Sequence, residues 1–128
     1  MRVTRSTGLD LTRRVAMTPD LLARLASVSG PSPLMRVIED ALRFYFESHE
    51  ERGHGYLAYL HDPLAAAVAL DPRLVTTRAV TVDVALTGAT VADWSGARQP
   101  NAQLGIGVDP AVFFDRFIER VGRFSRRT

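Results

Sequence analysis

The stretch Leu60-His61-Asp62-Pro63-Leu64-Ala65 decides the fold, because it opens an apolar helix and places a histidine beside a carboxylate at the start of that helix. An aspartate followed by proline is typical of an N-cap and the first helical residue, since proline lacks the N–H that would be unpaired there. We therefore expect a helix that begins at Asp62. The residues that follow, as far as Leu70, are apolar on every face, which predicts a helix buried on all sides.

His61 and Asp62 are candidate functional residues because of this position. The unpaired N–H groups and the dipole of a helix N-terminus favour an ionised carboxylate, and a fixed carboxylate suits a hard cation such as calcium or magnesium. The adjacent imidazole suits proton donation or an N–H hydrogen bond. The same pattern of a capping residue and proline occurs at Thr18-Pro19, Ser32-Pro33 and Asp109-Pro110, so helix capping alone would also explain Asp62.

Upstream of this stretch, the pattern predicts one strand and two helices. We expect a strand around residues 2–11, and then a small helix from Thr18-Pro19 to Gly30-Pro31. A longer helix opens at Ser32-Pro33, and its apolar stripe recurs at steps of three and four through Leu34, Ile38, Ala41, Leu42, Tyr45 and His49. Tyr45 and His49 lie one turn apart on one face. Their spacing alone favours the half-buried end of a core stripe.

Downstream, the spacing becomes that of β-strands. Apolar residues alternate from Val80 to Leu86, Thr87-Gly88 predicts a turn, and shorter strands are expected over 91–94 and 101–108. Gly105 and Gly107 in the last strand permit close backbone approach. A final helix opens at Asp109-Pro110, and its buried stripe is expected to comprise Phe113, Phe114, Phe117, Ile118 and Val121.

Composition limits the functions that the chain can have. Its 128 residues, 46% of them hydrophobic, favour one globular domain or fragment spanning 1–128. The absence of cysteine excludes disulfides, thiolate metal sites and cysteine nucleophiles. The net charge is +2, and the arginines near the C-terminus fall at helical spacing without an aromatic platform, so we expect no nucleic-acid partner. No apolar run reaches the roughly 18 residues of a membrane span, and we expect a cytoplasmic protein with no membrane partner.

The order of these segments resembles the C-terminal portion of the inosine-uridine preferring nucleoside hydrolases over nearly the whole chain. The resemblance rests on an ordered series: Gly8-Leu9-Asp10-Leu11-Thr12, Leu60-His61-Asp62-Pro63, Asp71-Pro72, the run from Val80 to Gly88, Val91-Ala92-Asp93, Pro100-Asn101 and Val108-Asp109. It implies an α/β fold that forms the C-terminal part of an open-sheet domain. In that fold, helices are followed by a three-stranded antiparallel unit and a final helix.

The resemblance also implies roles for individual residues. Enzymes of this family hydrolyse the N-glycosidic bond of ribonucleosides with a calcium-bound water. His61 would then protonate or hydrogen-bond the leaving base, Asp62 would be a calcium ligand, and Tyr45 and His49 would contact the nucleobase. The family's aspartate-rich Asp-Thr-Asp-Pro-Gly-x-Asp-Asp signature does not occur in this chain. Calcium needs six to eight oxygens, so we expect weak or no Ca²⁺ binding and no hydrolysis without the missing N-terminal half.

Two other functions compete with this hypothesis. The chain could be a non-catalytic oligomerising or interaction module derived from the family. A metal-dependent phosphohydrolase of the His/Asp type is the third hypothesis, but that class requires an all-helical framework, which the strands after Asp71 contradict. A chain that lacks half of its domain would expose apolar surface, which usually finds a partner. We therefore expect a homo-oligomer or a complementary chain, with strand exchange through the N-terminal strand as one route.

Overall fold

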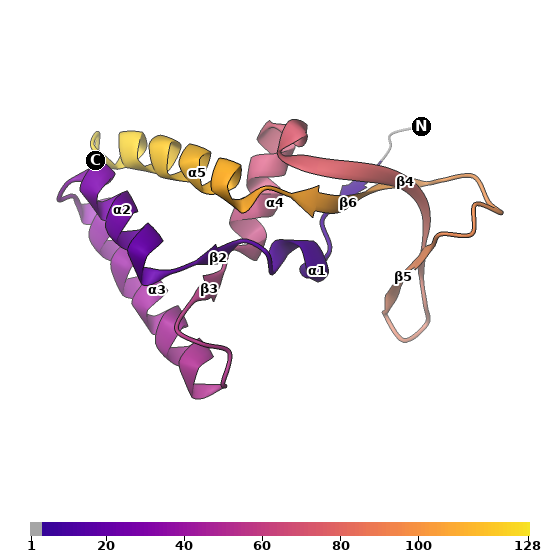
Figure 1. The fold of residues 1–128 in the computed structure, drawn as a ribbon, viewed down its shortest axis with the longest axis horizontal. Coiled ribbons are helices and arrows are strands. Elements are labelled where there is room, and N and C mark those ends of the chain that lie inside the picture. Colours follow the sequence, from indigo (N-terminus) through magenta and orange to yellow (C-terminus); the bar gives the residue numbers. More distant parts are fainter. Residues whose placement is uncertain (1–3) are drawn as a thin grey trace.

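A mixed sheet forms one end of the molecule in the computed structural model, which describes residues 4–128 (Figure 1). Its strands follow the order β1 (Thr4–Ser6), β6 (Ala102–Val108), β4 (Val75–Val84) and β5 (Thr90–Asp93). β4 pairs antiparallel with both β5 and β6, and β1 pairs parallel with β6. The predicted three-stranded antiparallel unit and the α/β class are therefore confirmed, with β1 as an additional edge strand.

The helices occupy the other end and the middle of the molecule. In Figure 1, α2 (Pro19–Ser29) and α3 (Pro33–Glu51) lie at the end opposite the sheet, and α5 (Pro110–Ser125) runs from β6 toward them. Thr18, Ser32 and Asp109 each accept a backbone N–H of the helix that follows, so these three predicted caps are confirmed. The remaining short elements are α1 (Leu9–Thr12), β2 (Ala16–Met17), β3 (Ala58–Tyr59), α4 (His61–Leu70) and the 3₁₀ helix η1 (Pro72–Leu74).

The core lies where the helices meet the sheet. Phe113 of α5 and Leu64 of α4 are almost completely buried, and they share one cluster with Leu11, Met17 and Leu25. The stripe predicted on α5 is confirmed, because Phe113, Phe114 and Ile118 are buried and Phe117 and Val121 pack partly buried against them. Burial of these apolar side chains is the main favourable contribution to folding.

The predicted N-terminal strand is too long. β1 ends at Ser6, and the carbonyl of Gly8 then accepts the N–H groups of Leu11 and Thr12 at 3.1 and 3.0 Å, which closes the helical turn α1. Asp10 therefore lies in a helical turn and not in a strand. Residues 2 and 3, which the prediction also included, lie outside the described residues.

The start of α4 also differs from the prediction. The helix begins at His61, one residue before Asp62, because the carbonyl of Leu60 accepts the N–H of Leu64 at 3.1 Å. Leu60 is the N-cap, with no side-chain cap, so Asp62 lies inside the first turn and does not cap the helix.

α4 is not buried on all sides. Leu64 and Val68 lie on its buried face, whereas Ala65, Ala66 and Ala69 are exposed and Leu70 is 75% exposed. A cavity of about 250 Å³ between α4 and α5 is lined by apolar side chains that include Ala66, Leu70 and Phe117. The described part of the chain therefore covers only one side of this apolar helix, and the expected exposed apolar surface is present.

The β4–β5 hairpin extends away from the helices (Figure 1). β4 begins at Val75, five residues before the predicted start at Val80, because it pairs with β6 from Val75 onward. Thr87-Gly88 forms the predicted turn, with the Gly88 N–H bonded to the Ala85 carbonyl at 2.8 Å. The apolar face predicted for this strand is buried only in part. Val84 lies beyond the region that the helices cover and is 72% exposed.

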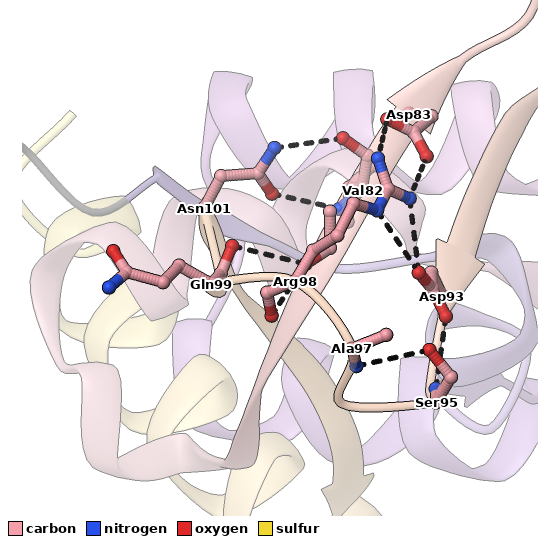
Figure 2. A network of polar contacts seen from close by, with 9 residues as sticks. Val82, Asp83, Asp93, Ser95, Ala97, Arg98, Gln99 and Asn101 are labelled. Atoms are coloured by element: carbon pink, nitrogen blue, oxygen red, sulfur yellow. Dashed lines mark hydrogen bonds and ion pairs between the residues drawn. The ribbon is translucent and has the colours of Figure 1, made fainter.

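A polar network holds the loop between β5 and β6 against β4 (Figure 2). Asn101 continues the strand pairing with its side chain, because its amide accepts the Val82 N–H at 2.8 Å and donates to the Val82 carbonyl at 2.9 Å. Arg98 forms ion pairs with Asp83 and Asp93 on the two strands of the hairpin. Asp83, on β4, is therefore paired with the loop that follows the hairpin.

None of the helices within residues 4–128 combines the length and the apolar character that spanning a membrane requires.

Candidate functional site

A small two-stranded unit positions the start of α4. Ala16 of β2 pairs with Tyr59 of β3, and the Leu60 N–H extends this pairing to the Val15 carbonyl at 2.9 Å. Leu64, one turn into α4, has no solvent-exposed surface. Because both the backbone before the helix and its first buried side chain are fixed, the position of His61 is set by packed elements and not by a free loop.

The side chain of His61 contacts Thr12, which lies 49 residues earlier in the chain. Thr12 Oγ1 lies 2.6 Å from Nδ1 of the ring, and Thr12 is only 3% exposed. Sequence reasoning did not single out Thr12, although it is the last residue of the Gly8-Leu9-Asp10-Leu11-Thr12 segment that carried the family resemblance. Only the three-dimensional pairing of α1 with α4 reveals its contact with His61.

Three of the four predicted site residues lie along one row of contacting rings. Tyr45 packs edge to face on His49 with ring centroids 4.6 Å apart, and His49 packs on Tyr59 at 5.4 Å. Tyr59 then lies 5.8 Å from His61. The row therefore connects the C-terminal half of α3 to the first residue of α4. Tyr59 was also missed by sequence reasoning, and its position two residues before His61 is the only signal in the sequence.

His49 is the buried member of this row. It is 8% exposed, and its Nδ1 has no hydrogen-bond partner among the described residues. Burial lowers the pKa of His49 below its ordinary value of 6.5, and the neighbouring His54, Arg52 and His61 lower it further. Buried polar atoms are seldom left unpaired, so this nitrogen is an exception among the described residues.

Asp62 lies apart from these contacts. Its side chain is exposed in the first turn of α4. Among the side chains of residues 6–128, no group of three or more histidines, aspartates or glutamates gathers as a metal site. Calcium takes about six to eight oxygens, so the described residues alone do not fit a calcium ion. Asp62 could supply one ligand of such a site, and further ligands would have to come from elsewhere.

A comparison with protein-family models matches residues 2–115 to the inosine-uridine preferring nucleoside hydrolases. The chain belongs to this family. Among curated relatives, the inosine-uridine preferring nucleoside hydrolase of Crithidia fasciculata is 33% identical over 128 residues, which cover 90% of this chain and 39% of that protein. The pyrimidine-specific ribonucleoside hydrolase RihA of Salmonella newport is 32% identical, and the match covers 92% of this chain and 40% of the relative.

Solved structures of nucleoside hydrolases share the fold. The purine-preferring ribonucleoside hydrolase of Gardnerella vaginalis superimposes with a TM-score of 0.86 at 27% identity, covering 98% of this chain and 42% of that one. A plant nucleoside hydrolase matches with a TM-score of 0.78 at 26% identity, covering 94% of this chain and 41% of its own. The chain therefore has the fold of one portion of a nucleoside hydrolase, and it spans about 40% of the length of these relatives.

Proposed function

We propose that this chain is the C-terminal portion of a calcium-dependent ribonucleoside hydrolase and is inactive without the N-terminal portion. The observation that carries the proposal is the row of rings from Tyr45 through His49 and Tyr59 to His61. This row joins the two proposed base contacts to the proposed proton donor. The relatives act on purine and on pyrimidine nucleosides by their names, so the proposed substrate class is the ribonucleoside.

His61 would assist the departure of the nucleobase. Cleavage of the N-glycosidic bond leaves its electron pair on the base, which is a poor leaving group unless it is protonated or hydrogen-bonded. A positioned general acid contributes about 10²- to 10⁴-fold to such a step. The contact with buried Thr12 supports this role, because a ring fixed on one nitrogen presents the other in a defined direction.

Tyr45 and His49 would hold the nucleobase. Tyr45 is half-buried and offers an aromatic edge or face, and His49 packs against it with an Nδ1 that is buried and has no partner among the described residues. Because its pKa is lowered by burial, His49 stays neutral near pH 7 and contacts an uncharged base without a desolvated charge.

Asp62 would supply one carboxylate to a calcium site whose other ligands belong to the N-terminal portion. When bound, the metal would orient water and lower its pKa. Because Asp62 is exposed, its carboxylate would be able to bind the same metal ion as residues of another segment.

The experiment is to measure ribose release from inosine and from uridine by the 128-residue chain, alone and mixed with the N-terminal portion of the Crithidia fasciculata relative. Each mixture is assayed with calcium and with a chelator. We expect no release by the chain alone, and calcium-dependent release by the mixture. His61→Ala and Asp62→Asn should abolish release from inosine, and Asp20→Asn, an exposed first-turn carboxylate on α2, is the matched control.

Two outcomes would contradict the proposal. Release by the chain alone would mean that residues 1–128 assemble a complete site. A mixture that forms a complex by light scattering and still releases no ribose would favour the second candidate, a non-catalytic oligomerising module. The exposed apolar face of α4, with Leu70 75% exposed, is the observation that supports that second candidate.

A further inference from the structure

The contact between Thr12 and His61 joins two elements that the fold holds rigidly. Thr12 ends α1, where the buried side chain of Leu11 anchors the turn, and His61 begins α4 above the buried Leu64. Between them, β2 and β3 pair antiparallel. The contact therefore joins two fixed elements, and no loop has to become ordered for the two side chains to meet.

The hydrogen of the Thr12 hydroxyl has two possible acceptors. The Leu9 carbonyl lies 3.4 Å from Oγ1 and already accepts the Arg13 N–H at 3.0 Å. His61 Nδ1 lies at 2.6 Å, within hydrogen-bonding distance and closer to Oγ1 than the carbonyl is. The contact with His61 is therefore the better of the two, and the tautomer of the ring decides which atom donates.

A hydroxyl serves this position whether the ring is neutral or protonated. It donates to a bare Nδ1, and it accepts from Nδ1–H, in which case its own hydrogen turns to the Leu9 carbonyl. In both cases Nδ1 is engaged by a residue that is 3% exposed. Only Nε2 remains to meet a ligand.

We propose that Thr12 is the positioning residue of His61, holding Nδ1 so that Nε2 is the nitrogen that exchanges a proton with the leaving nucleobase. This inference rests on the proposed function. As the C–N bond breaks, its electron pair passes to the base, the Nε2 proton of the imidazolium passes to the base, and the ring keeps its Nδ1–H on Thr12. Water supplies the new ribose hydroxyl, and its released proton replaces the one that was donated.

The first test uses NMR on the 128-residue chain and needs no activity. In the wild-type protein, we expect one slowly exchanging proton in the contact between Thr12 and His61, carried by Thr12 Oγ1 or by His61 Nδ1 and coupled to the Nδ1 nitrogen. In Thr12→Val, the ¹⁵N resonance of Nδ1 should move to that of an unbonded imidazole nitrogen, and the couplings about χ1 of His61 should show averaged rotamers. Thr12→Ser, which keeps the hydroxyl, should retain the wild-type signals.

Two results would overturn the inference. One is a wild-type protein in which neither the Thr12 hydroxyl proton nor an Nδ1–H proton is protected from exchange, so that no proton is shared between Oγ1 and Nδ1; this result does not depend on whether any variant folds. The other is a folded Thr12→Val protein whose Nδ1 resonance and ring couplings match those of the wild type.

The second test uses the mixture with the N-terminal portion. Thr12→Val should lower kcat for inosine by about tenfold or more with little change in KM, because it weakens a general-acid contribution of about 10²- to 10⁴-fold. The rate with 4-nitrophenyl riboside should fall much less, since 4-nitrophenolate departs without a proton. An equal loss with both substrates would overturn the positioning role. Failure of the wild-type mixture to hydrolyse either substrate would instead overturn the proposed function, while the NMR result would still decide the contact.

Discussion

Gly105 of β6 lies directly against Leu11 of α1: a Cβ added to the glycine would stand 2.7 Å from Leu11 Cδ2. Leu11 is 1% exposed and cannot swing into solvent without leaving the core. We predict that Gly105→Ala destabilises the chain by about 1–3 kcal/mol, the usual cost of overpacking a core. Denaturant unfolding monitored by circular dichroism would measure the change.

Gly107→Ala is the matched control for this prediction. It lies two residues further along the same strand, and an added Cβ there would meet Thr76 at 3.6 Å, an ordinary contact distance. It should leave stability within about 0.5 kcal/mol of the wild type. Equal effects of the two variants would mean that the approach of α1 to β6 carries no special constraint.

His49 should make the stability of the chain depend on pH. Burial, followed by the charges of His54, Arg52 and His61, lowers the pKa of His49 below 6.5 in the folded chain. The unfolded chain therefore binds more protons just below pH 6.5, and stability should fall as pH drops from 6.5 toward the folded pKa. His49→Phe keeps an aromatic ring and should remove this loss, which denaturant midpoints measured at pH values above and below 6.5 would show. If the pH dependence persists in His49→Phe and disappears when the exposed His54 is changed to Phe, then His54 causes the effect and the prediction is wrong.

Asp93 should remain ionised to a lower pH than an ordinary aspartate. Hydrogen bonds from Ser95, followed by Arg98, lower the pKa of Asp93 from its ordinary value of 3.8 to about 2 (Figure 2). Its contribution to stability should be complete above pH 3.8 and should be lost as the pH falls through about 2. The ¹³C resonance of the carboxyl group should titrate near pH 2 in the wild type, and Arg98→Ala should raise that midpoint. A wild-type midpoint near 3.8 would contradict the hydrogen bonding that fixes this loop.

The helices that the sequence predicts well are those with local signals. Thr18, Ser32 and Asp109 accept backbone N–H groups within two or three residues, so residue type and spacing alone contain the information. The apolar period of α5 likewise reports a face that is buried within this chain. Such signals depend on neighbours along the sequence and not on the rest of the fold.

The errors occur where distant contacts decide the structure. The strand predicted to reach Leu11 ends at Ser6, because the Leu11 side chain packs against Gly105, a residue that only the sheet topology brings near. His61 and Asp62 can be selected by their place at a helix start, and Tyr45 and His49 only by the resemblance to the family. Thr12 could not be selected as the partner of His61, since no pattern along the chain joins residues 49 positions apart.

The apolar face of α4 predicts the behaviour of the chain in solution. Leu70 is 75% exposed at the rim of a cavity of about 250 Å³ between α4 and α5, whose lining includes Leu74 and Phe117. Exposed apolar surface that is part of a larger patch usually finds a partner, so we expect the chain alone to form a dimer or a higher oligomer at micromolar concentration. Leu70→Glu should shift the species seen by light scattering toward the monomer, because a charge at this rim is costly to bury.

Leu86→Glu, at the fully exposed hairpin tip, is the matched control and should leave the assembly unchanged. A wild-type chain that is monomeric at micromolar concentration would contradict the prediction, and loss of assembly in Leu86→Glu alone would place the contact on the hairpin.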